Sequence, residues 1–181
     1  MLIGGADEEI AGIIEKINSF EDFFTTSSCS GRITLISIPE IGAKREAKFI
    51  GKWHRPVKRE EVTEAIKTSE KGDVWLLSQS PILHVACRNL EKAKELLRIA
   101  IESGFKYSGI KAISNSKDNE KVVVEILSTE RMDVPLCNDD MMFCSEAHMD
   151  FILSQSNFML ERGKEKLKRF YYELKGFAPQ R

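Results

Sequence analysis

A short run of hydroxyl, thiol and guanidinium side chains is the segment of this sequence best suited to chemistry. It covers residues 26–32 (TSSCSGR) and lies between a predicted helix and a predicted strand. The hydroxyls, the guanidinium of Arg32 and the backbone amides freed by Gly31 could together hold a carboxylate or another anion. A serine-rich turn whose hydroxyls bond their own backbone would give the same pattern. The sequence leaves both interpretations open.

Cys29 in this run is a candidate nucleophile, because Arg32 nearby would stabilise a thiolate. The cysteine-to-arginine spacing of the phosphatase motif is absent, however, and no neighbouring residue supplies a general base. A packed or ligand-lining thiol is therefore the better interpretation of Cys29.

His84 and Glu125 are the candidates for proton transfer, and both fall in predicted strands. His84 shares a strand face with Arg88, which predicts that the two line a pocket, although a hydrogen-bonded structural histidine explains the pattern nearly as well. Glu125 shares its face with apolar residues, so it is either paired with a cation, Lys111 or Arg131, or has a raised pKa. A buried ion pair would explain Glu125 without catalysis.

Residues 44–59 combine positive charge with aromatic side chains. They hold seven basic residues against Glu46, a local charge of +6, so the rest of the chain carries −7 within a formal net charge of −1. Phe49, Trp53 and His54 interleave with these charges, as in proteins that bind a phosphate backbone with an unstacked base nearby. The alternative is a solvated strand face with Trp53 buried in the core.

Length and composition exclude several classes of protein. The chain has 181 residues, 42% hydrophobic and 30% charged, which suits a globular domain rather than a disordered chain or a fibre. No apolar run is long enough for a membrane helix, so we expect a soluble, cytoplasmic protein without a membrane partner. The four cysteines form no CxxC pair, and Cys137, Cys144 and His148 lack a fourth ligand, so we expect reduced thiols and no metal.

Hydrophobic periodicity places the candidate residues on helices and strands. A turn is expected at 25–31 and a polar linker around 133–136, and Asn89 and Gly104 are expected to begin and end a helix. The strand at 45–54 is expected to carry a basic row on one face, opposite Phe49 and Trp53. The expected helices are 7–24, 59–70, 90–101 and 146–175, and the expected strands are 32–38, 45–54, 73–78, 82–88, 110–114 and 121–127.

Two stretches of the sequence resemble each other. Phe23–Ser37 and Phe105–Ser114 each contain an aromatic residue, a polar turn, Ser-Gly and a strand that ends in Ile-Ser. We interpret them as an internal duplication within a single domain of residues 1–181, with repeats at about 7–78 and 81–175. Hairpins mixed with helices indicate an α+β fold with one shared sheet. No glycine-rich loop joins a strand to a helix, so a Rossmann site and a P-loop are both disfavoured.

Several segments, in order along nearly the whole chain, resemble the wybutosine-synthesising N4-methyltransferase family, including its archaeal members. The most specific is SSCSGR, and the matching segments are 24–33 (FTTSSCSGRI), 51–54 (GKWH), 78–88 (SQSPILHVACR), 108–111 (SGIK) and 128–131 (STER) with Pro135. The resemblance implies S-adenosylmethionine-dependent methylation of N4 of the 7-(3-amino-3-carboxypropyl)-4-demethylwyosine base beside the anticodon of tRNA(Phe). It also implies a barrel-like mixed sheet built from duplicated units.

These motifs nominate positions, and we assign hypothetical roles to them. His84 is the preferred proton acceptor and Glu125 the alternative. The residues expected to hold the amino-carboxylate end of the donor or of the substrate side chain are Ser28, Ser30, Gly31 and Arg32. The residues expected to engage the base and the phosphates are Lys48, Lys52, Trp53, His54, Arg55, Arg88 and Lys111. The alternative function is a non-catalytic RNA-binding module, and in either case we expect a monomer or a weak homo-oligomer.

Overall fold

The computed structural model describes residues 8–43, 45–116, 119–139 and 141–177. These residues form four helices and nine strands, which divide into two compact units. Unit 1 is built from residues 1–30, 81–129 and 163–181, and unit 2 from residues 31–80 and 130–162. Each unit has its own sheet and its own core.

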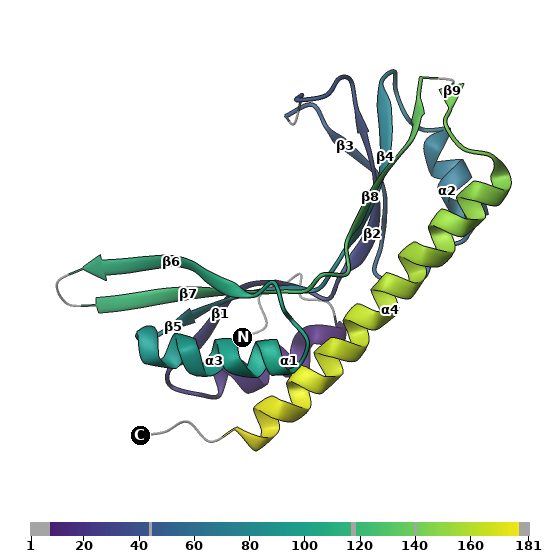
Figure 1. The fold of residues 1–181 in the computed structure, drawn as a ribbon. Helices are drawn as coiled ribbons and strands as arrows, with labels where there is room; N and C mark the ends of the chain where they lie inside the picture. The colour runs from purple at the N-terminus through teal and green to yellow at the C-terminus, as the bar shows by residue number, and fades with distance from the viewer. Residues whose placement is uncertain (1–7, 44, 117–118, 140, 178–181) are drawn as a thin grey trace. The chain divides into compact units, whose positions relative to one another are not determined.

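Unit 1 contains a four-stranded antiparallel sheet, here called sheet 1, with helices on one face (Figure 1). The helices are α1 (Glu8–Asn18), α3 (Leu90–Glu102) and the C-terminal part of α4 (Glu146–Gly176). The strand order is β1-β5-β7-β6, where the strands are β1 (Phe23–Cys29), β5 (Ile82–Cys87), β7 (Asn119–Leu127) and β6 (Gly109–Ser116).

Strict alternation in the two central strands separates the core of unit 1 from the opposite face. Leu83, Val85 and Cys87 of β5 pack with alternate valines of β7 in a core completed by the helices. Ile82, His84 and Ala86 point the other way, opposite Leu127, Glu125 and Val123 of β7. This second face, which the helices of unit 1 do not cover, is called the outer face of sheet 1. The predicted alternation of this strand, with His84 on the opposite face from Leu83, Val85 and Cys87, is confirmed.

Unit 2 contains a five-stranded antiparallel sheet, sheet 2, with strand order β3-β2-β4-β8-β9. Helix α2 (Arg59–Ile66) and the N-terminal part of α4 pack on one face around a core that includes Leu35, Leu76 and Leu153. The opposite, outer face of sheet 2 carries Arg32 and Thr34. The strands are β3 (Lys48–Trp53), β2 (Arg32–Ile38), β4 (Asp73–Gln79), β8 (Met132–Asn138) and β9 (Met141–Met142).

The local helix signals act as predicted at both ends of α3. The side chain of Asn89 accepts a hydrogen bond from the backbone N–H of Lys92 at 2.9 Å, which satisfies a donor that the first turn leaves free. Gly104 follows the helix with φ of +104°, a conformation that glycine adopts without strain. No helix among the described residues is both long and apolar enough to cross a membrane.

Two segments predicted as irregular are strands, so both predictions were wrong. Most of the expected turn at 25–31 belongs to β1, which pairs along its length with β5. The expected linker around 133–136 lies in β8, between β4 and β9. Pro135 is tolerated there because it sits at a register shift, where the ladder is already interrupted.

The predicted α+β class is confirmed, but the predicted single barrel-like mixed sheet is wrong. The strands of the described residues form two separate sheets, both antiparallel throughout. The chain passes from sheet 1 to sheet 2 between β1 and β2 and returns between β4 and β5, so each of these two pairs of consecutive strands is divided between the two cores. The internal duplication stays a prediction.

The predicted basic row on β3 is also wrong, because a β-bulge breaks the alternation of the strand. The register shifts by one residue between Leu35 and Ile36 of the neighbouring β2. Lys52 therefore lies opposite Thr34 and Lys48 opposite Ser37, which point to different faces. For the same reason, Phe49 and Trp53 point to different faces of the sheet.

Candidate active site

Four side chains form a continuous polar line across sheet 1. The Oγ of Ser27 lies 2.8 Å from Nδ1 of His84, and Nε2 of His84 lies 3.0 Å from Oε1 of Glu125. The Nζ of Lys111 lies 2.9 Å from the same carboxylate oxygen. These residues come from β1, β5, β7 and β6 in their spatial order, and we call them the sheet 1 line.

Two bulges and a glycine bring these residues together. His84 and Glu125 are direct cross-strand partners, while a register shift between Thr25 and Ser27 places Ser27 opposite His84. A second shift between Ile110 and Ala112 leaves Lys111 outside the ladder. The cross-strand partner of Glu125 on β6 is Gly109, and a Cβ built there would meet no atom within 4 Å.

The charges along the line determine which atoms donate. The hydrogen bond from Lys111 and, to a lesser extent, the one from His84 hold the pKa of Glu125 below its ordinary value. An ionised carboxylate only accepts hydrogen bonds, so Nε2 of His84 carries the hydrogen and donates it to Glu125. In neutral His84, Nδ1 is then the acceptor for the hydroxyl hydrogen of Ser27.

The surroundings of the line on the outer face of sheet 1 are apolar. Ile82 and Leu127 form the cross-strand pair on one side of His84 and Glu125, and Ala86 and Val123 form the pair on the other. Phe24, the partner of Ala86 on β1, is 59% exposed. The line is therefore a narrow polar strip on an otherwise apolar surface.

A second set of polar groups lies on the outer face of sheet 2. Nε of Arg32 donates to the side-chain oxygen of Gln79 at 2.6 Å, and its guanidinium lies over the ring of Phe49. Thr34 Oγ1 and Trp75 Nε1 on this face are buried, and neither has a hydrogen-bond partner within the part of the chain that the structure describes. Unpartnered buried polar atoms are unusual in folded proteins and fit a surface that a polar ligand completes.

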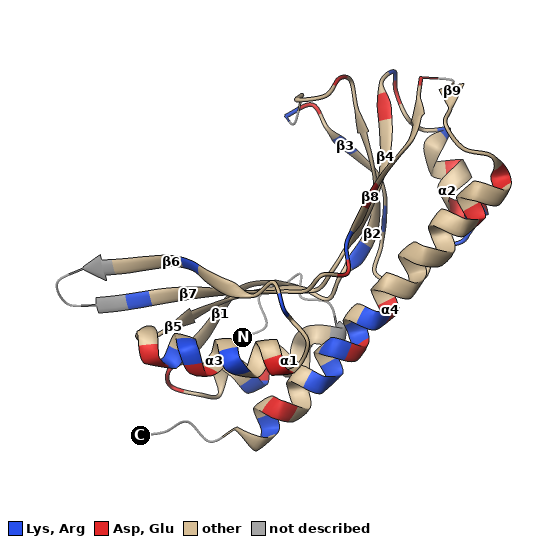
Figure 2. Ribbon diagram, viewed as in Figure 1, with Lys and Arg blue, Asp and Glu red and all other residues tan. Residues whose placement is uncertain are grey.

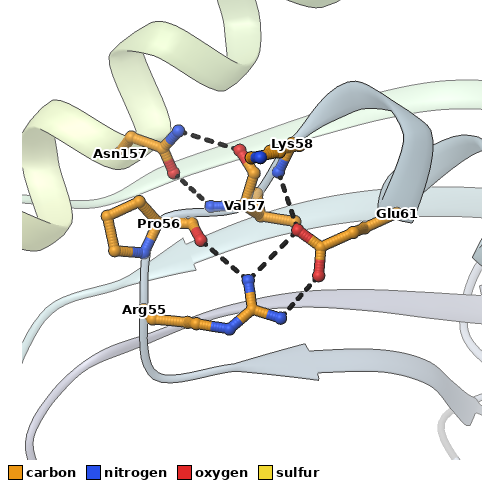
Figure 3. Close-up of polar contacts among 6 residues, drawn as sticks. All are labelled: Arg55, Pro56, Val57, Lys58, Glu61 and Asn157. Atoms are coloured by element: carbon orange, nitrogen blue, oxygen red, sulfur yellow. Dashed lines mark hydrogen bonds and ion pairs between the residues drawn. The ribbon is translucent and has the colours of Figure 1, made fainter.

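A loop between β3 and α2 holds further candidate residues in a fixed shape (Figure 3). Arg55 makes two hydrogen bonds to the carboxylate of Glu61, at 2.5 and 3.1 Å, and these lower the pKa of Glu61 to about 2. The side chain of Asn157 on α4 clamps the loop, because its oxygen accepts from the N–H of Val57 and its nitrogen donates to the Val57 carbonyl, both at 2.9 Å. Each polar backbone group of buried Val57 is thereby satisfied.

Comparison with known proteins agrees with the resemblance inferred from the sequence. Residues 1–176 match the sequence family described as Methyltransferase TYW3. The chain belongs to this family.

Curated relatives from archaea support this assignment over most of the chain. A tRNA(Phe) 7-((3-amino-3-carboxypropyl)-4-demethylwyosine(37)-N(4))-methyltransferase of Pyrococcus horikoshii is 50% identical over 166 residues, which cover 92% of this chain and 83% of the relative. A methyltransferase of the same description from Methanocaldococcus jannaschii is 40% identical over 168 residues, covering 92% of this chain and 85% of the relative.

Solved structures have the same fold. The structure of the PH1069 protein from Pyrococcus horikoshii matches with a TM-score of 0.87 at 48% identity, covering 94% of this chain and 86% of that one. The structure of a hypothetical protein from Aeropyrum pernix matches with a TM-score of 0.79 at 31% identity, covering 94% and 98%.

Within this family member, most of the predicted RNA-binding cations already have acidic partners. Lys48 pairs with Glu70 at 2.6 Å, and Arg55 pairs with Glu61. Lys52 makes no hydrogen bond or ion pair with any described residue. Figure 2 shows acidic residues interspersed with the basic ones, also along α4. Three of the seven basic residues of 44–59, namely Lys48, Arg55 and Arg59, are thus paired with acidic groups that lie outside that stretch of sequence.

The other predicted RNA-binding residues have structural partners. Arg88 pairs with Asp22 at 3.0 Å rather than joining His84. Trp53 packs against the core of unit 2, with its ring so close to Gly51 that a Cβ there would clash. His54 Nδ1 lies 3.0 Å from the carbonyl of Gly31, to which it donates. Of the two partners considered for Glu125, Lys111 is the actual one.

The residues predicted to bind the donor are divided between the two units. Ser28 and Ser30 belong to unit 1, where Ser28 pairs with Leu83 and so faces the core side, and Ser30 is buried. Gly31 and Arg32 belong to unit 2. The sequence interpretation included Ser27 in the hydroxyl run but assigned it no role beside His84, because only the bulge in β1, which has no sequence signal of its own, places this residue opposite His84.

Burial disfavours the thiolate form of three of the four cysteines. All four are free thiols, and burial raises the pKa of Cys87 to about 12 and also raises those of Cys137 and Cys144. Among the residues placed by the structure, no group of three or more His, Cys, Asp or Glu side chains is arranged to hold a metal ion.

Proposed function

We propose that this protein transfers a methyl group from S-adenosylmethionine to N4 of the 7-(3-amino-3-carboxypropyl)-4-demethylwyosine base at position 37 of tRNA(Phe), in the cytoplasm. The observation that carries this proposal is the sheet 1 line, a hydrogen-bonded chain of Ser27, His84, Glu125 and Lys111 on the apolar outer face of a sheet. Membership of the methyltransferase family supplies the reaction class, and the names of the relatives supply the substrate.

The chemistry of the reaction accounts for a proton acceptor at this position. S-adenosylmethionine, when bound, supplies a methyl group made electrophilic by a positively charged sulfur. The nitrogen of the 4-demethyl base carries a hydrogen where the methyl group will be, so that hydrogen must leave as a proton. His84, held in one tautomer by ionised Glu125, is suited to accept it. Correct alignment of the two reacting groups supplies much of the remaining rate.

The outer face of sheet 1 suits a flat, largely apolar base. Ile82, Ala86, Val123 and Leu127 surround the polar line, and a tricyclic ring laid on them would bury apolar surface on both partners. The gap left by Gly109 gives such a ring room beside Glu125. We therefore place the base on this face.

Arg32 is our first choice for the amino-carboxylate end of the donor. Gln79 occupies only its Nε, so the two terminal nitrogens can form a paired contact with a carboxylate. Buried Thr34 Oγ1 and Trp75 Nε1 on the same face of sheet 2 also fit a polar ligand, since both lack partners among the described residues. Gly31, Ser28 and Ser30 remain proposed contributors. Because both sheets are antiparallel, we propose a donor site unlike the parallel-sheet crevice of a Rossmann fold.

For the RNA backbone, Lys52 is the strongest proposed contact. It is exposed and on the same face of sheet 2 as Arg32, and its charge has no partner among the described residues. Lys48 and Arg55 would have to exchange a carboxylate for a phosphate. The remaining proposed contacts also have packing or hydrogen-bond partners within the protein. They are Trp53, His54, Arg88 and Lys111.

The test is transfer of labelled methyl from S-adenosylmethionine to tRNA(Phe) that carries the demethylated precursor, followed by digestion to nucleosides. We expect the N4-methylated nucleoside with the wild-type protein, and loss of at least tenfold in transfer for Arg32→Ala. Arg131→Ala is the matched control, because Arg131 is an exposed arginine paired with Asp133. A folded wild-type protein that binds the tRNA but transfers no methyl would instead be an RNA-binding module.

A further inference from the structure

We propose that Ser27 is the catalytic residue that contacts the substrate nitrogen, and that it relays the N4 proton to His84. This inference rests on the proposed function and deepens it. His84, the residue nominated from the sequence as the proton acceptor, would then receive the proton without touching the base.

The first argument is that both ring nitrogens of His84 are already engaged. Nε2 faces the carboxylate of Glu125 at 3.0 Å, and Nδ1 faces the hydroxyl of Ser27 at 2.8 Å. A substrate N–H could reach Nδ1 directly only by displacing Ser27. The hydroxyl of Ser27 is therefore the accessible end of the line.

The solvent exposure of the side chains also supports a relay that runs from the substrate through Ser27 to His84. The side chains of His84 and Glu125 are 25% and 18% exposed, whereas Ser27 is an exposed residue. A residue that contacts a large base must lie at the surface. A residue that holds the transferred proton is better oriented when hydrogen-bond partners fix its side chain. Ser27 meets the first requirement and His84 the second.

The relay balances atoms and charge. The N4–H bond breaks as its proton passes to Oγ of Ser27, while the original hydroxyl proton passes to Nδ1 of His84. The electron pair left on N4 forms the bond to the methyl carbon, and the electrons of the broken methyl–sulfur bond stay on sulfur, which leaves as a neutral thioether. The positive charge thus moves from sulfur to the His84 imidazolium, next to ionised Glu125.

Glu125 and Lys111 act as positioning residues in this relay. Glu125 holds the hydrogen of His84 on Nε2 and so leaves Nδ1 free to accept. Lys111 keeps Glu125 ionised through its own hydrogen bond to Oε1. The titratable and charged groups of the described residues that face His84 along the line are these two.

The neighbouring hydroxyls of β1 cannot replace Ser27 in this geometry. Thr26 uses its hydroxyl to donate to the backbone carbonyl of His84 at 3.2 Å. Ser28 is the cross-strand partner of Leu83, a core residue, and so lies on the other side of the sheet. The bulge between Thr25 and Ser27 therefore selects a single hydroxyl.

The experiment measures single-turnover methyl transfer at saturating S-adenosylmethionine and precursor tRNA. For Ser27→Ala we expect a loss of about 100-fold or more, the usual contribution of a proton-transfer group, with tRNA affinity and thermal stability close to wild type. Thr26→Val, the matched control in the same strand, should stay within about threefold of wild type. Ser27→Thr keeps a hydroxyl and should recover most of the rate, even if the alanine variant folds poorly.

A double-mutant comparison separates a relay from two independent contributions. If Ser27 and His84 act as one unit, Ser27→Ala combined with His84→Ala will be no slower than the slower single variant. The wild-type rate should also rise with pH to a plateau, and Ser27→Ala should lose that dependence. Multiplicative losses, or a Ser27→Ala rate equal to wild type, would overturn the relay. If the wild-type protein transferred no methyl at all, the proposed function itself would fail.

Discussion

The two units of this protein use similar polar residues in opposite ways. In unit 1, the sheet 1 line runs across neighbouring strands and ends at an exposed hydroxyl. In unit 2, the loop after β3 closes on itself, because Arg55 and Glu61 satisfy each other and Asn157 satisfies the backbone of Val57. The sheet 1 line ends at a hydroxyl that can still form a hydrogen bond with a substrate. The hydrogen bonds of the loop are all made within the protein, so they only fix the conformation of the loop.

The same contrast holds for individual cations. Arg59 is paired with two acidic residues of α4, at 2.9 and 3.3 Å, while Arg32 uses only one nitrogen for Gln79. Counting charges along the sequence treats the two arginines alike. The difference in their remaining hydrogen-bonding capacity is what separates a structural residue from a candidate ligand.

Among the residues compared here, replacing Glu125 of the sheet 1 line should cause the largest loss of methyl transfer. In Glu125→Gln the amide can no longer fix the His84 tautomer by charge, so we expect single-turnover methyl transfer to fall by on the order of 10²-fold. Glu91→Gln, an exposed glutamate on α3, is the matched control and should retain the wild-type rate. If Glu125→Gln retained the wild-type rate, the ion pair of Glu125 would have only a structural role.

The same variant carries a pH signature. The pKa of Glu125 is lowered in the folded state, so its stabilising contribution is present above its ordinary pKa and is lost as the pH falls through the lowered value. Acid unfolding of Glu125→Gln, followed by circular dichroism, should therefore depend less steeply on pH than that of the wild type.

Breaking the closed loop should affect stability more than the chemical step. Asn157→Ala removes both hydrogen bonds to the backbone of buried Val57, and we expect a loss of about 1–3 kcal/mol in the free energy of unfolding. Denaturant titration measures this, with the neighbouring Gln155→Ala as control. A single-turnover rate that fell as far as in Glu125→Gln, without loss of stability, would contradict a purely structural clamp.

The smallest effect is expected for tRNA binding by β3, where Lys52 and Lys48 can be compared as a matched pair. Lys52→Glu should weaken tRNA binding by about tenfold and reduce the salt slope by about one, since an unpaired cation releases a counterion on binding phosphate. Lys48→Glu should change both quantities less, because Glu70 already neutralises Lys48. Filter binding at several salt concentrations gives both values, and equal effects of the two substitutions would remove the distinction.

Local patterns in the sequence predicted the residues whose environment is set by their own strand or helix. The alternation of β5 placed His84 on the opposite face from Leu83, Asn89 was expected to cap α3, and Lys111 was one of two partners considered for Glu125. The contact of Ser27 with His84 could not be predicted in this way, because it depends on a bulge that forms only against β5. The strand at 132–138 was missed because its pairing partner, β4, lies more than fifty residues away in the sequence.

The interleaving of the units also constrains the order in which the chain can fold during synthesis. Among the residues that the structure places, the core of unit 2 includes none beyond Leu160, but that of unit 1 includes Leu167, Phe170 and Leu174 on the last helix. Strand β1 therefore leaves the ribosome long before its core can close, and must wait while residues 31–80 assemble elsewhere. Contacts of such large sequence separation slow folding, so we expect unit 2 to become protected from hydrogen exchange before unit 1.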